Sequence, residues 1–221
     1  MISDGKQLEQ LFQEINQSLT VKVPLYIIGG AALLYQGLKI VTKDIDVIAD
    51  DTASFDTIVT TLLSLEFKRK DPTGTYKKMH INAILERQDF RIDLFLKTVC
   101  KKVRLSTAMK NRAIPILTLK NLQVFLCSNE DIFLFKSMTE REGDLEDCIA
   151  LVQRGIQWNI ILNEIKSQIQ MSGKDIWITW IGERLDHLEE KGLTIPIMKT
   201  INQLRDDYFY NLEKQLSNKI N

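Results

Sequence analysis

Apolar and polar positions follow two different periods along this chain, and the change between them predicts two regions. In the first region, short apolar runs of strand length alternate with segments whose apolar residues recur every three or four positions. From about residue 129 onward the helical spacing continues, with only glycine and proline interruptions. The pattern therefore predicts a mixed α/β region followed by an almost wholly helical one.

The first region has the order helix, strand, helix, strand, helix, strand, strand, which is typical of a mixed sheet with helices packed against it. Ser3 or Asp4 can cap the first helix, and Ser54 or Asp56 can cap the third. We predict an α+β fold, with an α/β domain over residues 1–125 and a helical domain over residues 126–221. The predicted strands are residues 25–28, 45–49, 78–86 and 91–97, and the predicted second and third helices are residues 31–36 and 55–65.

Charge and hydropathy exclude several classes of protein. The 221 residues include 29 Lys and Arg and 29 Asp and Glu, so the formal net charge is zero. Any binding to nucleic acid or anionic lipid has to come from local patches, because a protein-wide attractive field is absent. No apolar run approaches the roughly 20 residues of a membrane span, and the first residues lack the apolar core of a secretion signal. We expect no membrane partner.

The cysteines are odd in number and widely spaced, at Cys100, Cys127 and Cys148. With only His80 and His187 to accompany them, the sequence does not favour a Cys/His zinc site. We expect buried, reduced thiols in a cytoplasmic protein.

Three carboxylates fall on predicted strands. Asp44 and Asp46 flank Ile45, and because residues two apart in a strand point to the same face, both carboxylates aim at one point. Like charges this close repel unless a cation lies between them, and Mg²⁺ (or Mn²⁺) takes such hard oxygen ligands. Asp93 could supply a third ligand if its strand pairs beside residues 45–49. Taken alone, an Asp-x-Asp is more often a pair of solvated acids at a strand end.

Gly29 and Gly30 stand between the strand of residues 25–28 and the next predicted helix. Glycines at such a turn let the main chain approach a phosphate closely, and a helix N-terminus favours negative charge. Tight packing explains two glycines about as well, and neither a P-loop nor a dinucleotide-binding pattern is present. The informative feature is the order: strand, Gly-Gly, helix, strand with Asp-x-Asp, then a later strand with Asp.

This ordered set resembles the DNA polymerase β-like nucleotidyltransferase superfamily, whose pattern is a hydrophobic residue, Gly, Gly or Ser, a spacer, Asp-hydrophobic-Asp and a later strand with a third acid. More narrowly, residues 28–33 with residues 42–46 look like the AbiEii and MenT-type abortive-infection toxins and their uncharacterised relatives. Those relatives carry a helical segment similar to Phe135-Lys136 followed by residues 141–147. The resemblance implies a minimal nucleotidyltransferase fold followed by a helical domain that closes over the nucleotide.

The resemblance also implies an activity, the transfer of a nucleoside monophosphate from a nucleoside triphosphate (NTP) to an acceptor hydroxyl. Asp44, Asp46 and Asp93 would be the catalytic and metal-binding residues, and Asp93 could act as the base toward the hydroxyl. The implied nucleotide-binding residues are Gly29, Gly30, Thr42, Lys43, Lys136 and Asp144.

Two of these implied positions lie in the helical region. Lys136 would neutralise phosphate charge, and Asp144 would face the nucleotide or orient Lys136, although a lysine near an apolar helix face often simply extends its charge to water. Such families often carry Arg two residues before the Thr, where this chain has Ile40 with Lys39 beside it. A positive charge is therefore kept nearby, but the bidentate fork of Arg is lost.

The acceptor and the biological role stay open at this point. A basic segment after Asp93 could meet a polynucleotide such as tRNA, although an exposed lysine-rich helix explains it as well. A protein or a small molecule such as an antibiotic is an alternative acceptor, and the resemblance makes a toxin with an antitoxin partner an option. A catalytically silent nucleotide-binding module and a neutralising antitoxin are the non-enzymatic alternatives. The basic segment consists of Lys97, Lys101, Lys102, Arg104, Lys110 and Arg112.

Overall fold

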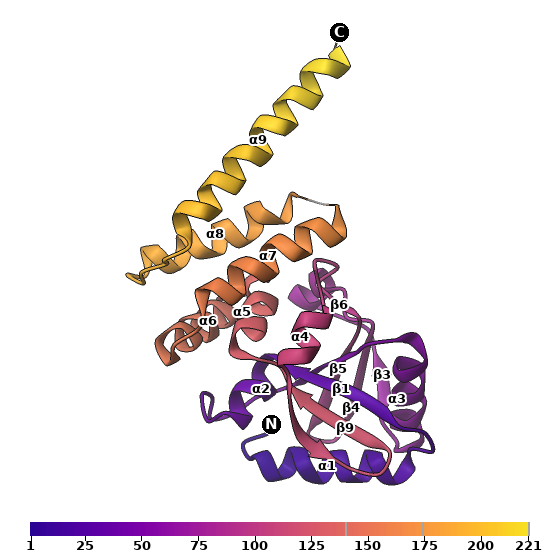
Figure 1. Cartoon of the computed structure of the whole chain (residues 1–221). Helices are drawn as coiled ribbons and strands as arrows, with labels where there is room; N and C mark the ends of the chain where they lie inside the picture. Colours follow the sequence, from indigo (N-terminus) through magenta and orange to yellow (C-terminus); the bar gives the residue numbers. More distant parts are fainter. Residues whose placement is uncertain (140, 174, 221) are drawn as a thin grey trace. The chain divides into compact units, whose positions relative to one another are not determined.

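A computed structural model describes residues 1–139, 141–173 and 175–220 of the chain (Figure 1). Its described part divides into two compact units, the first spanning Met1–Phe135 and the second beginning at Lys136. The first unit holds the sheet and the second is built from helices, so the predicted α+β fold with a helical C-terminal part is confirmed. The division lies later in the chain than the boundary predicted after residue 125, which falls inside the last strand of the sheet.

Within the described residues, one mixed seven-stranded sheet has the order β3-β4-β5-β2-β1-β9-β8. β2 pairs with β5 and β1 with β9 in parallel, and the other neighbours are antiparallel. The central strands β1 and β2 are almost wholly buried, as expected for strands covered on both faces. The strands are β1 Val23–Ile28, β2 Ile45–Ala49, β3 Lys68–Lys70, β4 Ala83–Arg87, β5 Phe90–Leu96, β8 Ile114–Thr118 and β9 Leu122–Leu126, with the small pair β6 Thr98–Val99 and β7 Val103–Arg104.

Helices flank this sheet. α1 begins after Asp4, whose carboxylate accepts the Lys6 amide, and its predicted apolar face is buried. α3 packs against β1, β2, β4 and β5, and α2 connects β1 to the loop before β2. The helices of this unit are α1 Gly5–Ser18, α2 Gly29–Tyr35, α3 Thr52–Ser64 and α4 Thr107–Arg112, with the 3₁₀ helix η1 Gly74–Met79. α5 Asn129–Ser137 begins in this unit and ends in the second.

The second unit is organised around α8, which contacts α6, α7 and α9. Buried apolar residues such as Ile181 and Leu185 line α8 at helical spacing, and Trp177 is buried at its start. The second half of α9 leaves Phe209, Leu212 and other apolar residues exposed. The helices are α6 Glu142–Arg154, α7 Trp158–Ser172, α8 Trp177–Glu190 and α9 Met198–Ile220.

Several local predictions were wrong. The strand predicted over residues 78–86 begins only at Ala83, because η1 and the left-handed residue His80 occupy the start of that range. The cap of α3 is Asp51, which accepts the Ser54 amide at 2.7 Å, and not Ser54 or Asp56. The edge strand β3 has no apolar residue to reveal it and was missed.

None of the described helices is both long enough and apolar enough to span a bilayer.

Candidate active site

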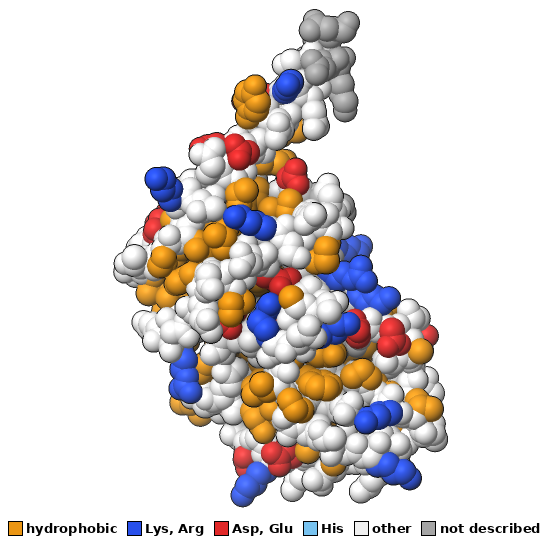
Figure 2. All heavy atoms as spheres, in the orientation of Figure 1, with side chains coloured by type: hydrophobic (Ala, Val, Ile, Leu, Met, Phe, Trp, Pro, Cys, Tyr) orange, Lys and Arg blue, Asp and Glu red, His pale blue; other side chains and the backbone are white. Residues whose placement is uncertain are grey.

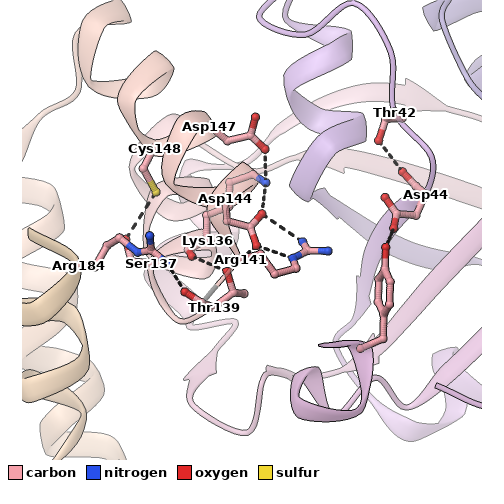
Figure 3. A network of polar contacts seen from close by, with 11 residues as sticks. Thr42, Asp44, Lys136, Ser137, Thr139, Arg141, Asp144, Asp147, Cys148 and Arg184 are labelled. Atoms are coloured by element: carbon pink, nitrogen blue, oxygen red, sulfur yellow. Dashed lines mark hydrogen bonds and ion pairs between the residues drawn. The ribbon is translucent and has the colours of Figure 1, made fainter. Parts of the chain in front are cut away.

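The paired acids Asp44 and Asp46 lie where the loop after α2 enters β2. Asp46 is the second residue of the strand and is only 6% exposed, whereas Asp44 lies just before the strand and is half-buried. The Tyr76 hydroxyl donates a hydrogen bond of 3.1 Å to the Asp44 carboxylate (Figure 3). These two acids therefore stand at the same end of β2, two residues apart.

Asp93 is brought to the same place by strand pairing. β2 and β5 are parallel neighbours, and the register puts Asp46 directly opposite Asp93. Paired residues of adjacent strands point to the same face, so the two carboxylates are neighbours although they are 47 positions apart in the chain. The predicted pairing of the Asp93 strand beside residues 45–49 is confirmed.

Gly29 is the first residue of α2, and its Cα lies close to the side chain of Asp46. Its φ of +66° lies in the left-handed region, and a Cβ built there would overlap the Asp46 carboxylate. A Cβ on Gly30 would overlap the Thr42 hydroxyl in the same way. The two glycines are thus required by the close approach of the turn to Asp46 and Thr42, whatever ligand their amides bind.

The loop that carries Thr42 is held on both sides. The Thr42 hydroxyl donates to the Asp44 carbonyl at 3.0 Å, and the Thr42 main chain pairs with Ile2 through hydrogen bonds of 2.9 and 2.8 Å. Lys43 is exposed. The first residues of the chain therefore help to fix the approach to β2, a contact for which the sequence carries no local signal.

Lys39 is the cation of this loop that lies beside the glycine turn. Its Nζ is 4.0 Å from the point that a Cβ on Gly30 would occupy, and its side chain is half-buried. Ile40, where Arg was expected from the resemblance, is 88% exposed. The loop thus brings position 39, and not position 40, to the diglycine.

Arg91 forms a two-pronged ion pair with Asp93. Its Nε and Nη2 donate to the two carboxylate oxygens at 2.8 and 2.9 Å, and its guanidinium stacks on the Tyr76 ring at 4.0 Å from the centroid. Burial alone would lower the pKa of Arg91, but the hydrogen bond and charge of Asp93, with smaller contributions from Tyr76 and Asp44, raise it. The guanidinium is held as a cation among these acids.

The residues fit a divalent cation in type, because Asp44, Asp46 and Asp93 offer hard carboxylate oxygens from one end of two adjacent strands. Among the described residues, however, no three His, Cys, Asp or Glu side chains are grouped closely enough to hold a metal ion. Both oxygens of Asp93 are engaged by Arg91. The three-acid ligand set stays a prediction.

Lys136 and Asp144 come together in the second unit. Lys136 is 4% exposed, and its Nζ contacts Asp144 at 2.9 Å and Asp147 at 2.6 Å. Arg141 donates to both oxygens of Asp144 at 2.7 and 3.1 Å, and the Thr139 hydroxyl also contacts this carboxylate (Figure 3). Asp144 is therefore an ion-pair partner of both Lys136 and Arg141.

Charge and burial shift the ionisation of this cluster in opposite directions. Burial alone would lower the pKa of Lys136, but the charges of Asp144 and Asp147 outweigh it and raise the pKa. Burial alone would raise the pKa of Asp144, but the charge of Lys136 and the contacts of Arg141 lower it to about 2. Both groups are charged at neutral pH.

The basic segment after Asp93 is not a uniform cationic patch. Lys110 pairs with Asp50 at 2.6 Å, and Arg112 pairs with the buried Asp131 at 2.6 Å. Figure 2 shows Lys and Arg side chains spread over the visible face, with one gathering in the region of β6 and β7. The pairing of Lys110 and Arg112 with acids thus limits the positive charge that the segment can offer a polyanion.

The cysteines are buried thiols, as predicted. Burial raises the pKa of Cys148 to about 12 and raises that of Cys127 as well, which disfavours the reactive thiolate at neutral pH.

Sequence reasoning missed Arg91 and Tyr76, and it noted Lys39 only as a positive charge beside Ile40. Arg91 could have been found from its spacing, since it stands two residues before Asp93 on the same strand. Tyr76 has no such signal, because its hydrogen bond to Asp44 spans 32 positions of the chain.

Comparisons with known proteins place this site in context. Residues 6–175 match the family described as nucleotidyltransferase of unknown function (DUF6036). A comparison with curated proteins finds no match. The crystal structure of ANT(2")-Ia in complex with adenylyl-2"-tobramycin is similar with a TM-score of 0.48 and 10% identity over 76% of this chain and 97% of that one. The solution structure of the antibiotic-resistance factor ANT(2'')-Ia gives a TM-score of 0.44 and 11% identity over 86% and 98%.

Proposed function

Since this chain belongs to the DUF6036 family of nucleotidyltransferases, we propose that it moves a nucleoside monophosphate from an NTP to an acceptor hydroxyl with the help of Mg²⁺ or Mn²⁺. The observation that supports this reaction most directly is the register of β2 and β5, which sets Asp46 opposite Asp93. Asp44 follows two residues away from Asp46, and Gly29 packs against Asp46. Such an arrangement suits phosphoryl transfer, in which the protein mainly positions the groups and neutralises their charge.

In the proposed step, the acceptor oxygen attacks the α-phosphorus and the bond from that phosphorus to the α,β-bridging oxygen breaks. Pyrophosphate leaves with the electron pair of that bond, and the hydroxyl proton passes to Asp93. Asp44, Asp46 and Asp93 would hold the cation, which when bound supplies positive charge to the attacking and leaving oxygens.

The nucleotide-binding groups that we propose come from the glycine turn, the loop before β2 and the lysine cluster. The triphosphate would be bound by the amides of Gly29 and Gly30 at the β1–α2 turn. The side chains of Thr42 and Lys43, in the loop before β2, would also bind it. We add Lys39 to this set because its ammonium lies beside Gly30. Lys136, which is paired with Asp144, is kept in the set as a proposed nucleotide-binding residue with a positive charge.

The acceptor and the cellular role are proposed more broadly. Exposed members of the basic segment, such as Lys101 and Arg104, suit a polynucleotide acceptor such as tRNA, and a protein or small-molecule acceptor is the alternative. The likeness of the motifs to the AbiEii and MenT-type toxins supports a role as a cytoplasmic toxin that is neutralised by an antitoxin protein.

The reaction is tested with labelled NTPs, Mg²⁺ or Mn²⁺, and a panel of tRNA, protein and aminoglycoside acceptors followed by mass detection. Asp46→Asn and Asp93→Asn should each lower the transfer rate at least about a hundredfold, which corresponds to about 2.7 kcal/mol of transition-state stabilisation. The loss is expected because each variant replaces a negatively charged carboxylate of the site by a neutral amide.

Asp89→Asn is the matched control. Asp89 lies at the turn between β4 and β5, its side chain is 89% exposed, and it lies 3.7 Å from the chain's first amino group. Its variant should keep full activity. Absence of cation-dependent transfer by the unmodified protein to every acceptor, or full activity of Asp46→Asn, would contradict the proposal.

A further inference from the structure

Four side chains from two strands form the centre of the site. Asp44 and Asp46 lie at the start of β2, and Arg91 and Asp93 lie in β5. The parallel register sets Asp46 opposite Asp93. Asp44 precedes the paired residue Ile45 as Arg91 precedes its partner Ile92. Three acids and one guanidinium therefore share one face at the same end of the two strands.

The Arg91 guanidinium is hydrogen-bonded to both carboxylate oxygens of Asp93, a predicted metal ligand. Asp93 is 0% exposed, and both of its oxygens accept from Arg91. A carboxylate this deeply buried requires a positive partner, because burying an uncompensated charge is strongly unfavourable. Arg91 supplies that partner, and its positive charge competes with any divalent cation that binds the same carboxylate.

Arg91 has a way to leave Asp93 without leaving the site. Its side chain is 21% exposed, whereas that of Asp93 is fully enclosed. The Tyr76 ring lies against the guanidinium at 4.0 Å and attracts it as a cation–π partner. The same tyrosine donates to Asp44 at 3.1 Å, so one residue of η1 contacts both the competing cation and a predicted metal ligand.

We propose that Arg91 is an internal counter-ion of the catalytic acids, which neutralises Asp93 until a divalent cation displaces it. This inference rests on the proposed function. It assigns Arg91 a positioning role, because the ion pair keeps the Asp93 carboxylate in place before the cation binds. The pair also weakens cation binding, since Arg91 and the cation compete for the same carboxylate. The apparent Kd for the cation then equals the intrinsic Kd divided by the fraction of molecules in which Arg91 does not engage Asp93.

Direct Mn²⁺ binding, measured by titration calorimetry or by the electron paramagnetic resonance of free Mn²⁺, tests this role without turnover. Arg91→Gln should bind Mn²⁺ about tenfold more tightly than the unmodified protein, a change equal to about 1.4 kcal/mol. Without Mn²⁺ this variant should melt at a lower temperature, because Asp93 loses its partner. Saturating Mn²⁺ should raise its melting temperature by more than that of the unmodified protein.

Arg87→Gln is the matched control from the same hairpin. Arg87 also forms a two-pronged pair, with Glu14 at 2.6 and 2.7 Å, and also stacks on an aromatic ring, Phe67, at 4.5 Å. Its loss should lower the melting temperature and leave the Mn²⁺ affinity unchanged. Arg91→Lys keeps the charge without the fork, should tighten Mn²⁺ binding by a smaller factor, and replaces Arg91→Gln if the latter does not fold.

The outcomes separate this inference from the proposed function. If the unmodified protein binds Mn²⁺ and Asp46→Asn weakens that binding, the metal site stands, and equal or weaker binding by Arg91→Gln overturns only the counter-ion role. If the unmodified protein binds no Mn²⁺, both the metal-dependent reaction and the counter-ion role are overturned.

Discussion

At the scale of single residues, Gly29 meets two requirements at once. Its φ of +66° suits glycine, and any Cβ would overlap the carboxylate of Asp46. The residue thus couples the backbone of the β1–α2 turn to the position of the Asp46 carboxylate. A glycine that sequence reasoning assigned to phosphate binding has a steric function that is independent of any ligand.

Gly29→Ala should therefore destabilise the protein by about 1–3 kcal/mol, from strained backbone together with a displaced Asp46. Urea unfolding measures the loss, and transfer activity should fall with it. Gly143→Ala is the control, since Gly143 is exposed in α6, with nothing within 4 Å of its Cβ position. That change should leave stability equal or raise it by up to about 1 kcal/mol; equal stability of both variants would contradict the steric explanation.

Lys39 offers a second prediction at this scale. If its ammonium binds the triphosphate beside Gly30, Lys39→Gln should raise KM for the NTP roughly tenfold, or about 1.4 kcal/mol, with a smaller effect on kcat. Ile40→Arg should not lower KM, because the side chain at position 40 is 88% exposed. A large improvement in the Ile40→Arg variant would show that the arginine expected there does reach the nucleotide.

At the scale of elements, the cluster between α5 and α6 joins two helices through charge. Lys136 of α5 contacts Asp144 and Asp147 of α6, and Arg184 of α8 donates to the carbonyl of Thr139 in the intervening turn. The buried cluster is satisfied by several partners, so removal of one member leaves the others buried without compensation.

The cluster predicts a specific acid response. The pKa of Asp144 is about 2 in the folded protein against an ordinary value of 3.8, so the unfolded chain takes up the proton first. The stabilisation is complete above the ordinary value and is lost as the pH falls from about 4 to about 2. Asp144→Asn should be less stable at neutral pH and should lose less stability over that interval.

Chemical unfolding at pH 5, 4, 3 and 2 provides the measurement. Asp206→Asn, an exposed acid on α9, serves as the control and should follow the unmodified protein throughout. An Asp144→Asn curve parallel to that of the unmodified protein would show that Asp144 does not titrate as described.

Elements with a clear local pattern were predictable from the sequence. β2 was predicted with its observed bounds because apolar residues flank Asp46 on both sides, and α1 was predicted because Asp4 precedes a regular helical stripe. The η1 segment and β3 were missed, since neither has apolar periodicity and both depend on tertiary contacts. Of the site, the acids and glycines carry a spacing signal, but the engagement of Asp93 by Arg91 only becomes meaningful once β2 and β5 pair.

At the scale of the whole molecule, charge is balanced both in sum and locally. The formal net charge is zero. Within the basic segment, Lys110 and Arg112 form ion pairs with acids of the first unit. Long-range attraction of a polyanion is therefore weak, and recognition of a nucleic-acid acceptor would depend on short-range contacts. The two compact units divide between Phe135 and Lys136, a position inside α5, so the paired acids of β2 and β5 and the lysine cluster belong to different units.

The parallel pairing of β2 with β5 also constrains how the chain can change by insertion. Residues 50–89 connect the two strands, and lengthening that connection would leave the opposed carboxylates where they are. One residue added inside either strand would turn an acid to the opposite face of the sheet. We expect distant family members to vary freely in the length of this connection, while both two-residue spacings, Asp44 to Asp46 and Arg91 to Asp93, stay fixed.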